Sequence, residues 1–197
     1  MDPLKPITGL IDATEALLGH SPHPAIVTVP IGAWVVSNVC DALGLLTGRR
    51  RYDDAARLSM AVGLVGAAGA VVTGLRDYGH IPKDRPSHDV ATAHGLGNSV
   101  VASLFVASYV LRQRDHLSGR PPRLSSRLLA LAGGGLALYT AWLGCVLVEE
   151  YGEGVHPVMD RLSDEEREQE EARGRQRLSP ESPLGLHGEA QTASQQA

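Results

Sequence analysis

Residues 58–75 read LSMAVGLVGAAGAVVTGL, and no side chain in this stretch is charged. A helix on the surface of a water-soluble protein has a polar face that recurs with the helical period, and this stretch has none. A helix needs roughly 20 apolar residues to cross the hydrocarbon core of a bilayer. The stretch therefore predicts a transmembrane helix.

Three other segments share this character. Segments 90–111 and 128–148 contain no Asp, Glu, Lys or Arg, and segment 24–47 contains only Asp41. Short polar loops separate the four segments. We therefore predict an all-α fold, an integral membrane four-helix bundle formed by residues 20–158. The predicted spans are about 24–47, 56–76, 89–111 and 126–148.

The two ends of the chain differ from this central part. The spacing of Ile7, Leu10, Ile11 and Leu17 in residues 1–19 predicts a short amphipathic N-terminal helix lying at the membrane interface. Residues 159–197 are polar and, near their end, rich in Ser, Pro, Gly and Gln, which predicts a largely disordered C-terminal tail.

Charge and cysteine content narrow the function. A formal net charge of −4 gives no basic character of the kind that binds nucleic acid, so no nucleic-acid partner is expected. Cys40 and Cys145 are predicted near opposite faces of the membrane, too far apart for a disulfide. The sequence shows no zinc signature, phosphate-binding glycine loop or nucleophile elbow. Enzymatic activity and catalytic residues therefore stay undetermined at this level.

The distribution of arginine predicts the orientation in a cell inner or plasma membrane. With four spans, the loops after the first and third lie on one side. These loops and their flanks hold many arginines: Arg49, Arg50, Arg51, Arg57, Arg112, Arg114, Arg120, Arg123 and Arg127. The positive-inside rule places this side in the cytoplasm, which makes both termini extracytoplasmic.

Histidines gather at the opposite, predicted outer end of the bundle. They are His20, His23, His80, His88, His94 and His156, and Asp77, Glu149, Glu150 and Tyr151 lie at the same end. The predicted cytoplasmic loops contain only His116. This polar cluster is the strongest indication of a site in the sequence.

His94 and Asn98 lie four residues apart, so they share one face of the third span. Polar side chains within lipid usually point into the bundle. Two interpretations stay open: a hydrogen-bond network that joins helices, or a haem or metal ligand at His94 with Asn98 beside it. His23 is likewise either a histidine bonded to nearby backbone or a ligand.

Two other residues of the first span are expected to be structural. Pro24 suits the first turn of the helix, and Pro30 should kink it. For Asp41, near the cytoplasmic end and the run Arg49–Arg51, we expect an ion pair or a packing hydrogen bond.

Four stretches together resemble the DUF2231 family of small bacterial membrane proteins. They are GHSPHPAIVTVPIGAW (19–34) followed by CDALG (40–44), TGLRDYG (73–79), AHGLGNSVVA (93–102) and LGCVLVEEYGEGV (143–155). The resemblance covers roughly residues 19–155 and implies four membrane helices. It brings no established activity, although relatives joined to Rieske-type domains imply an electron-transfer setting. The matching polar positions are His23, Asp41, Asp77, His94 and Asn98.

This sequence departs from the family pattern at several positions. Tyr78 replaces the usual Trp, Cys145 replaces a Gly, and Glu149 stands where the family tends to have Tyr. Val146 falls where many members carry a His, so any ligand role of that histidine is lost here.

These observations lead to two main hypotheses. In the first, haem b or a metal is held at the outer end by His23 and His94, with Asn98 and Asp77 supporting them, and the protein exchanges electrons with a membrane or extracytoplasmic redox partner. In the second, a noncatalytic membrane module docks a partner, and the polar residues only pack the helices. A small transporter is the third possibility considered, but the spans lack an inverted repeat and paired acids at the midplane. The sequence is also compatible with a homo-oligomer.

Overall fold

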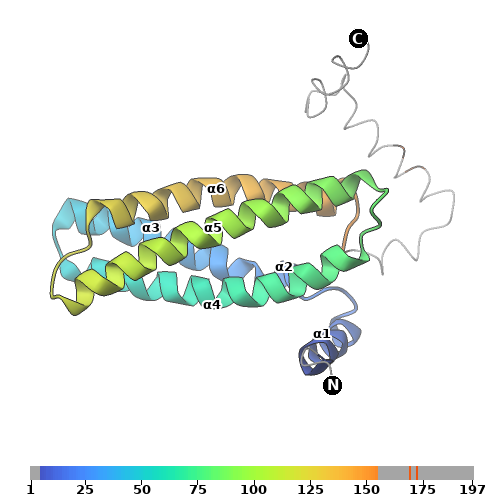
Figure 1. Ribbon diagram of the computed structural model, residues 1–197, viewed down its shortest axis with the longest axis horizontal. Coiled ribbons are helices and arrows are strands. Elements are labelled where there is room, and N and C mark those ends of the chain that lie inside the picture. The colour runs from blue at the N-terminus through green and yellow to red at the C-terminus, as the bar shows by residue number, and fades with distance from the viewer. Residues whose placement is uncertain (1–4, 155–168, 170–171, 173–197) are drawn as a thin grey trace, which may run out of the picture. The chain divides into compact units, whose positions relative to one another are not determined.

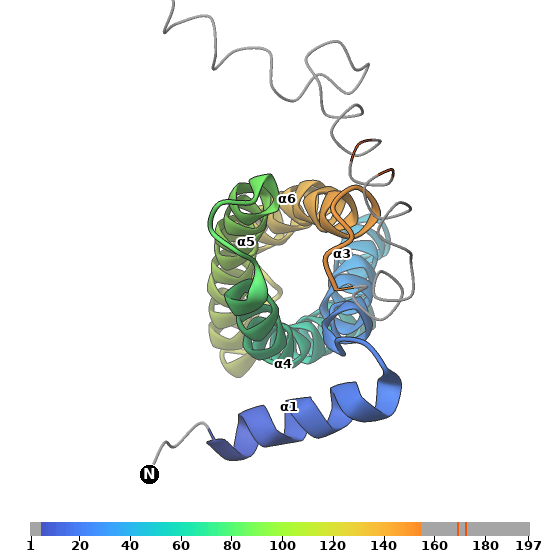
Figure 2. The same ribbon diagram turned by 90° about the vertical axis from the view of Figure 1, so that its right-hand side faces the viewer.

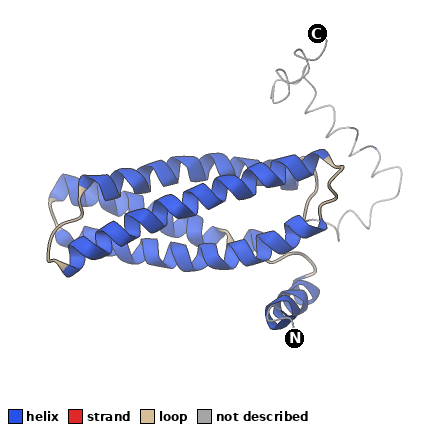
Figure 3. Ribbon diagram, viewed as in Figure 1, coloured by secondary structure: helices blue, strands red, loops and turns tan. Residues whose placement is uncertain are grey.

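The computed structural model describes residues 5–154, 169 and 172 (Figure 1). The helices are α1 (Lys5–Leu18), α2 (His23–Ile26), α3 (Thr28–Thr47), α4 (Arg50–His80), α5 (Pro86–Leu117) and α6 (Leu124–Glu149). Within the described residues the structure contains no strand (Figure 3). The all-α prediction is confirmed, and α1 forms where the amphipathic segment predicts a helix.

The chain divides into two units, residues 1–144 and 145–197, and the packing described below belongs to the first. There α3, α4, α5 and α6 run alternately up and down and follow one another around the bundle (Figure 2). Four segments are long and apolar enough to cross a membrane: His23–Thr47 and the helices α4, α5 and α6. The structure thus agrees with the predicted four-helix bundle.

The first span is interrupted near its start. A short helix, α2, ends at Ile26, and α3 begins at Thr28 after the single intervening residue Val27. Pro30 explains the break, because it has no N–H to donate to the carbonyl of Ile26 four residues earlier. The predicted distortion at this proline is confirmed.

Glycines of α4 allow α3 to approach closely. A Cβ at Gly63 would lie 2.3 Å from Nε1 of Trp34, and a Cβ at Gly66 would lie 2.8 Å from Cγ1 of Val29. Backbones that approach in this way gain van der Waals contact, which is a main source of helix association in lipid. The small residues of the second span therefore serve contacts within one chain.

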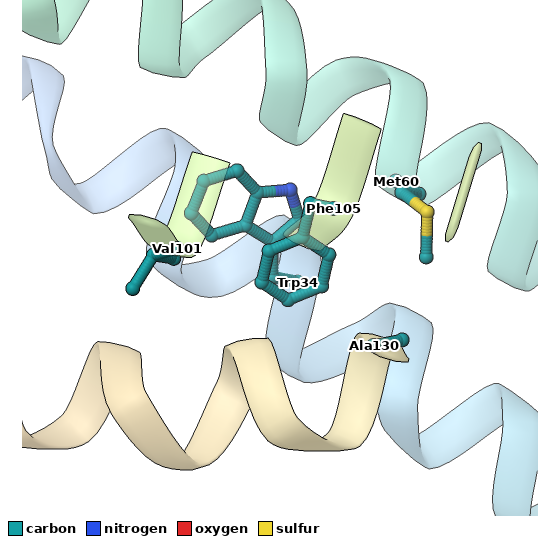
Figure 4. Packing of buried hydrophobic residues seen from close by; sticks show 5 residues of the cluster. All are labelled: Trp34, Met60, Val101, Phe105 and Ala130. Atoms are coloured by element: carbon teal, nitrogen blue, oxygen red, sulfur yellow. The ribbon is translucent and has the colours of Figure 1, made fainter. Parts of the chain in front are cut away.

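The centre of the bundle holds the largest apolar contact. Trp34 of α3 and Phe105 of α5 stack with ring centroids 4.1 Å apart and planes inclined by 9°. Met60, Val101 and Ala130 complete the buried cluster (Figure 4). All four long helices contribute to it, so this layer fixes their register relative to one another.

Elsewhere the distribution of side chains is the reverse of that in a soluble bundle. Large apolar side chains such as Val65 (76% exposed) and Leu138 (70%) face outward, whereas Ser37, Ser108 and Thr140 are almost completely buried. In water such an apolar surface would drive aggregation, but in lipid it is the favoured arrangement. The fold therefore fits a bilayer as its solvent.

An ion pair is buried close to the loops that follow α3 and α5. Both guanidinium nitrogens of Arg112 bind the Asp41 carboxylate, and the Nη1–Oδ1 distance is 2.7 Å. Arg127 donates to the Asp41 carbonyl oxygen at 2.9 Å and to the Asp53 carboxylate at 2.8 Å. The structural role expected for Asp41 is confirmed. Its ionic partner, however, is Arg112 of α5 and not the run Arg49–Arg51.

A second ion pair fastens the loop between α5 and α6. Arg123 donates to the Asp115 carboxylate through Nη2 at 2.6 Å, Nε at 2.9 Å and its backbone N–H at 3.1 Å. The side-chain hydrogen bonds raise the pKa of the Arg123 guanidinium above its ordinary value. The loop thus gains a fixed charge pair at the helix end.

In the second unit, the described part contains the end of α6 and a turn. The backbone N–H of Glu153 donates to the carbonyl of Leu147 at 2.9 Å, and Gly152 and Gly154 have positive φ values. Cys40 and Cys145 are both free thiols, as predicted. The predicted tail, apart from Gln169 and Ala172, lies outside the described residues.

Candidate functional site at the histidine end

The candidate residues from the sequence lie at one end of the first unit, which we call the histidine end. It comprises Gly19–Ile26, the end of α4, the start of α5 and the part of α6 around Thr140. The opposite end, which contains the α3–α4 and α5–α6 loops, is called the arginine end.

His94 and Asn98 form a closed set of hydrogen bonds with Thr140 of α6. Nδ1 of His94 donates to the Thr140 carbonyl at 2.8 Å. Nε2 of the same ring therefore accepts, and the Asn98 amide donates to it at 3.0 Å. The Thr140 hydroxyl donates to Oδ1 of Asn98 at 2.9 Å. The three residues join α5 to α6, and the predicted pairing of His94 with Asn98 is present.

His23 binds α4 in a comparable manner. Nδ1 of His23 lies 3.0 Å from the hydroxyl oxygen of Thr73. That hydroxyl is also within hydrogen-bond distance of the Gly69 and Ala70 carbonyls, to which it can give its only proton. It then accepts from Nδ1–H of His23. This arrangement favours the tautomer in which Nε2 of His23 carries the lone pair.

Asp77 supports His23 indirectly. Its carboxylate accepts a hydrogen bond of 2.6 Å from the Ser21 hydroxyl, whose oxygen accepts from the backbone N–H of His23 at 3.1 Å. Asp77 and His94 also lie close enough to the His23 ring to interact with it electrostatically. The structure thus brings all four candidates to one end of the bundle.

Two glycines make room for the histidine rings. A Cβ at Gly74 of α4 would lie 2.8 Å from Cε1 of His23, and a Cβ at Gly144 of α6 would lie 3.1 Å from Cε1 of His94. Each imidazole therefore packs directly on the backbone of a neighbouring helix. A larger residue at either position would force the ring to move.

The other histidines of the predicted cluster have local contacts. Nδ1 of His20 bonds the Ser21 carbonyl at 2.9 Å, and Nδ1 of His80 bonds the Arg76 carbonyl at 2.8 Å. The ring of His88 lies 4.9 Å from that of Tyr78. His156 falls outside the described residues, and Glu149, Glu150 and Tyr151 belong to the second unit.

The site offers two imidazoles as metal-binding groups. Within the described residues, no group of three or more His, Cys, Asp or Glu side chains is arranged to hold a metal ion. A haem needs only two axial ligands, and neutral histidine is a common one. A histidine that donates Nδ1–H to a neighbouring oxygen and keeps a lone pair on Nε2 has the usual form of a metal ligand.

Ser21, Thr73 and Thr140 received no role from the sequence, although Ser21 and Thr73 lie in stretches that resemble the family. All three are less than 7% exposed. Thr73 and Thr140 are the only threonines of the apolar segments 58–75 and 128–148, and their presence there was an available signal. A hydroxyl within a membrane helix usually bonds a carbonyl one turn earlier or a neighbouring helix.

Comparison with protein families matches residues 19–157 to DUF2231, described as a predicted membrane protein. Comparisons with curated proteins and with solved structures return no match. The matched range includes the whole histidine end and the four long helices.

Proposed function

The chain belongs to the DUF2231 family of predicted membrane proteins, and we propose that within the membrane it holds haem b between His23 and His94 and transfers electrons. The observation that carries this proposal is that both imidazole rings are hydrogen-bonded in the same way. Each is oriented through Nδ1 by an oxygen of another helix, and in each Nε2 has the acceptor form.

Two residues of the chain would supply the axial ligands of such a group. His23 and His94 come from different helices at the same end of the bundle, and a four-helix bundle commonly holds cofactors between facing helices. When bound, haem supplies one-electron chemistry at its iron. The chain itself contributes orientation, since the Thr73 hydroxyl and the Thr140 carbonyl each hold one ring through its Nδ1 atom.

Asn98 has a defined place in this proposal. Its amide now donates to Nε2 of His94, the atom that would ligate iron. Ligation requires this hydrogen bond to open, while the Thr140 hydroxyl can still hold the Asn98 carbonyl. Asn98 is therefore a positioning residue that competes for the ligand atom.

The orientation of the protein completes the proposal. The arginine end carries most of the basic side chains near the helices. In this proposal it therefore lies on the cytoplasmic side of a bacterial inner membrane. The histidine end then faces outward, where a membrane or extracytoplasmic redox partner would exchange electrons with the site.

A second candidate function is a noncatalytic membrane module that docks a partner. One observation favours it: His23, Asp77, His94 and Asn98 each bond a residue of another element, so a packing role accounts for all four. On this hypothesis the polar residues stabilise the bundle and bind nothing.

The two functions are separated by four variants expressed with haem precursor supplied. His23→Ala and His94→Ala should each abolish the reduced-minus-oxidised absorption bands seen in the unaltered protein. His88→Ala is the matched control, because it removes a histidine at the same end that bonds neither ring, and it should keep the bands.

The fourth variant is Asn98→Ala. Because it frees Nε2 of His94, this variant should keep haem, whereas the packing function predicts only a stability loss of about 0.6 kcal/mol. Unaltered protein without absorption bands, combined with a lower unfolding temperature for His94→Ala, would favour the packing function and exclude electron transfer.

A further inference from the structure

A cavity of about 240 Å³ lies at the arginine end, and neither His23 nor His94 lines it. It is formed by the start of α4, the end of α5 and the loop that follows α5. Its charged lining includes four arginines and two aspartates: Arg50, Arg57, Arg112, Arg120, Asp53 and Asp54. The positive charges therefore outnumber the negative ones.

The acidic groups of the cavity already have partners. Asp53 accepts from Arg127 at 2.8 Å, and Asp54 lies 3.4 Å from Nδ1 of His116. Arg112 is likewise engaged, because it binds the buried aspartate of α3 described above. Because His116 balances Asp54 only when it is protonated, the charge of the cavity depends on Asp54 and on three other arginines, and it is net positive.

Arg50, Arg57 and Arg120 form no ion pair with any residue that the structure describes. Arg50 donates to the carbonyl of Gly119 at 2.9 Å, and Nη1 of Arg57 donates to Gln113 at 3.2 Å. Nε of Arg57 is buried and, among the described residues, has no hydrogen-bond partner. A buried donor without a partner is unfavourable, so the hydrogen-bonding capacity of Arg57, which lines the cavity, is not fully used within the described residues.

We propose that this cavity binds a phosphate group. Guanidinium groups match phosphate oxygens in geometry and charge, and the N-terminus of the 31-residue helix α4 adds its partial positive charge. The cavity is smaller than the roughly 300–1,000 Å³ of pockets for larger organic ligands. It lies at the end of membrane helices, where basic pockets bind the headgroups of anionic lipids. The phosphate comes either from such a headgroup or from free inorganic phosphate.

The test measures thermal unfolding of the delipidated full-length protein in detergent. The probes are phosphatidylglycerol, zwitterionic phosphatidylcholine and inorganic phosphate. Arg120→Gln is the test variant, because Arg120 is exposed in a loop and its replacement should not disturb folding. Arg114→Gln is the matched control, an exposed arginine at the same end that does not line the cavity.

Phosphatidylglycerol should raise the unfolding temperature more than phosphatidylcholine does, and Arg120→Gln should weaken the apparent affinity about tenfold while Arg114→Gln leaves it unchanged. A shift with inorganic phosphate alone, lost in Arg120→Gln, would support the site with free phosphate as its ligand. Equal weakening in both variants, or no shift with either phosphate source, would overturn the proposal.

Discussion

Asp41 is the only acidic side chain of the first apolar segment, and it joins α3 to α5 and α6 at the arginine end. Its carboxylate is 7% exposed and the Arg112 guanidinium is fully buried, so neither charge has access to much water. Ser108 accepts from Nε of Arg112 at 3.1 Å, which satisfies a further donor. An ion pair that is so completely buried contributes little net free energy to folding. Loss of one member, however, leaves the other charge buried without a partner.

Asp41→Asn should therefore lower the free energy of unfolding by about 3–5 kcal/mol. Asp54→Asn is the control, because Asp54 is an aspartate at the same end whose side chain is 52% exposed, and it should change stability by less than about 0.5 kcal/mol. Denaturant unfolding in detergent measures both. Similar losses for the two variants would show that Asp41 does not form the buried pair.

Single residues also show where sequence reasoning about the site succeeds. The four-residue spacing of His94 and Asn98 predicts that they meet, because the helical period alone brings them together. Their common partner Thr140 is separated from Asn98 by 42 positions. No periodicity within one helix determines which residue of another helix lies opposite, so that contact required the structure.

At the scale of the elements, α3 and α4 depend on close approach. Their contact uses glycines of α4 where side chains of α3 occupy the space that a Cβ would need. The Trp34 indole packs directly on the backbone of Gly63 and also stacks on the ring of Phe105. Small changes at this layer should therefore affect the register of several helices.

Gly63→Ala should destabilise the bundle by about 1–3 kcal/mol, because its Cβ would lie 2.3 Å from Trp34 and force the indole off its stack. Gly135→Ala in α6 is the matched control. A Cβ there meets nothing within 4 Å, so the better helix propensity of alanine should leave stability unchanged or slightly raised. The unfolding temperature in detergent compares them. Equal behaviour of the two variants would contradict the close packing at Gly63.

The helix ends show the limit of the sequence interpretation. The length and apolarity of four segments predict four spans, but α4 and α5 continue past them into charged sequence. Arg112 follows the third apolar segment directly and was assigned to a cytoplasmic loop, yet it belongs to α5. Because a helix persists wherever its polar side chains find partners, hydrophobicity alone misses these last turns and the ion pair that they bring to Asp41.

The first unit has two polar ends separated by an apolar layer. The histidine end contains His23 and His94 with their hydrogen bonds and the Asp77 carboxylate, and the arginine end contains the buried Asp41–Arg112 pair and a basic cavity. The proposed orientation assigns the first to the outside and the second to the cytoplasm.

Cysteine accessibility in intact cells tests this orientation. In a background with Cys40→Ala and Cys145→Ala, Lys83→Cys places a thiol in the α4–α5 loop and Ser118→Cys places one after α5. A membrane-impermeant maleimide should label the first in intact cells and the second only after permeabilisation. The reverse pattern would place the histidine end in the cytoplasm.

The haem content of the purified, unaltered protein distinguishes haem binding by His23 and His94 from a packing role of the same residues. Expressed with haem precursor and measured as the pyridine haemochrome against protein concentration, the chain should carry about one haem, ligated by His23 and His94. Protein that is folded by thermal unfolding but carries no haem would contradict the account. The histidine end would then be a hydrogen-bonded junction between helices.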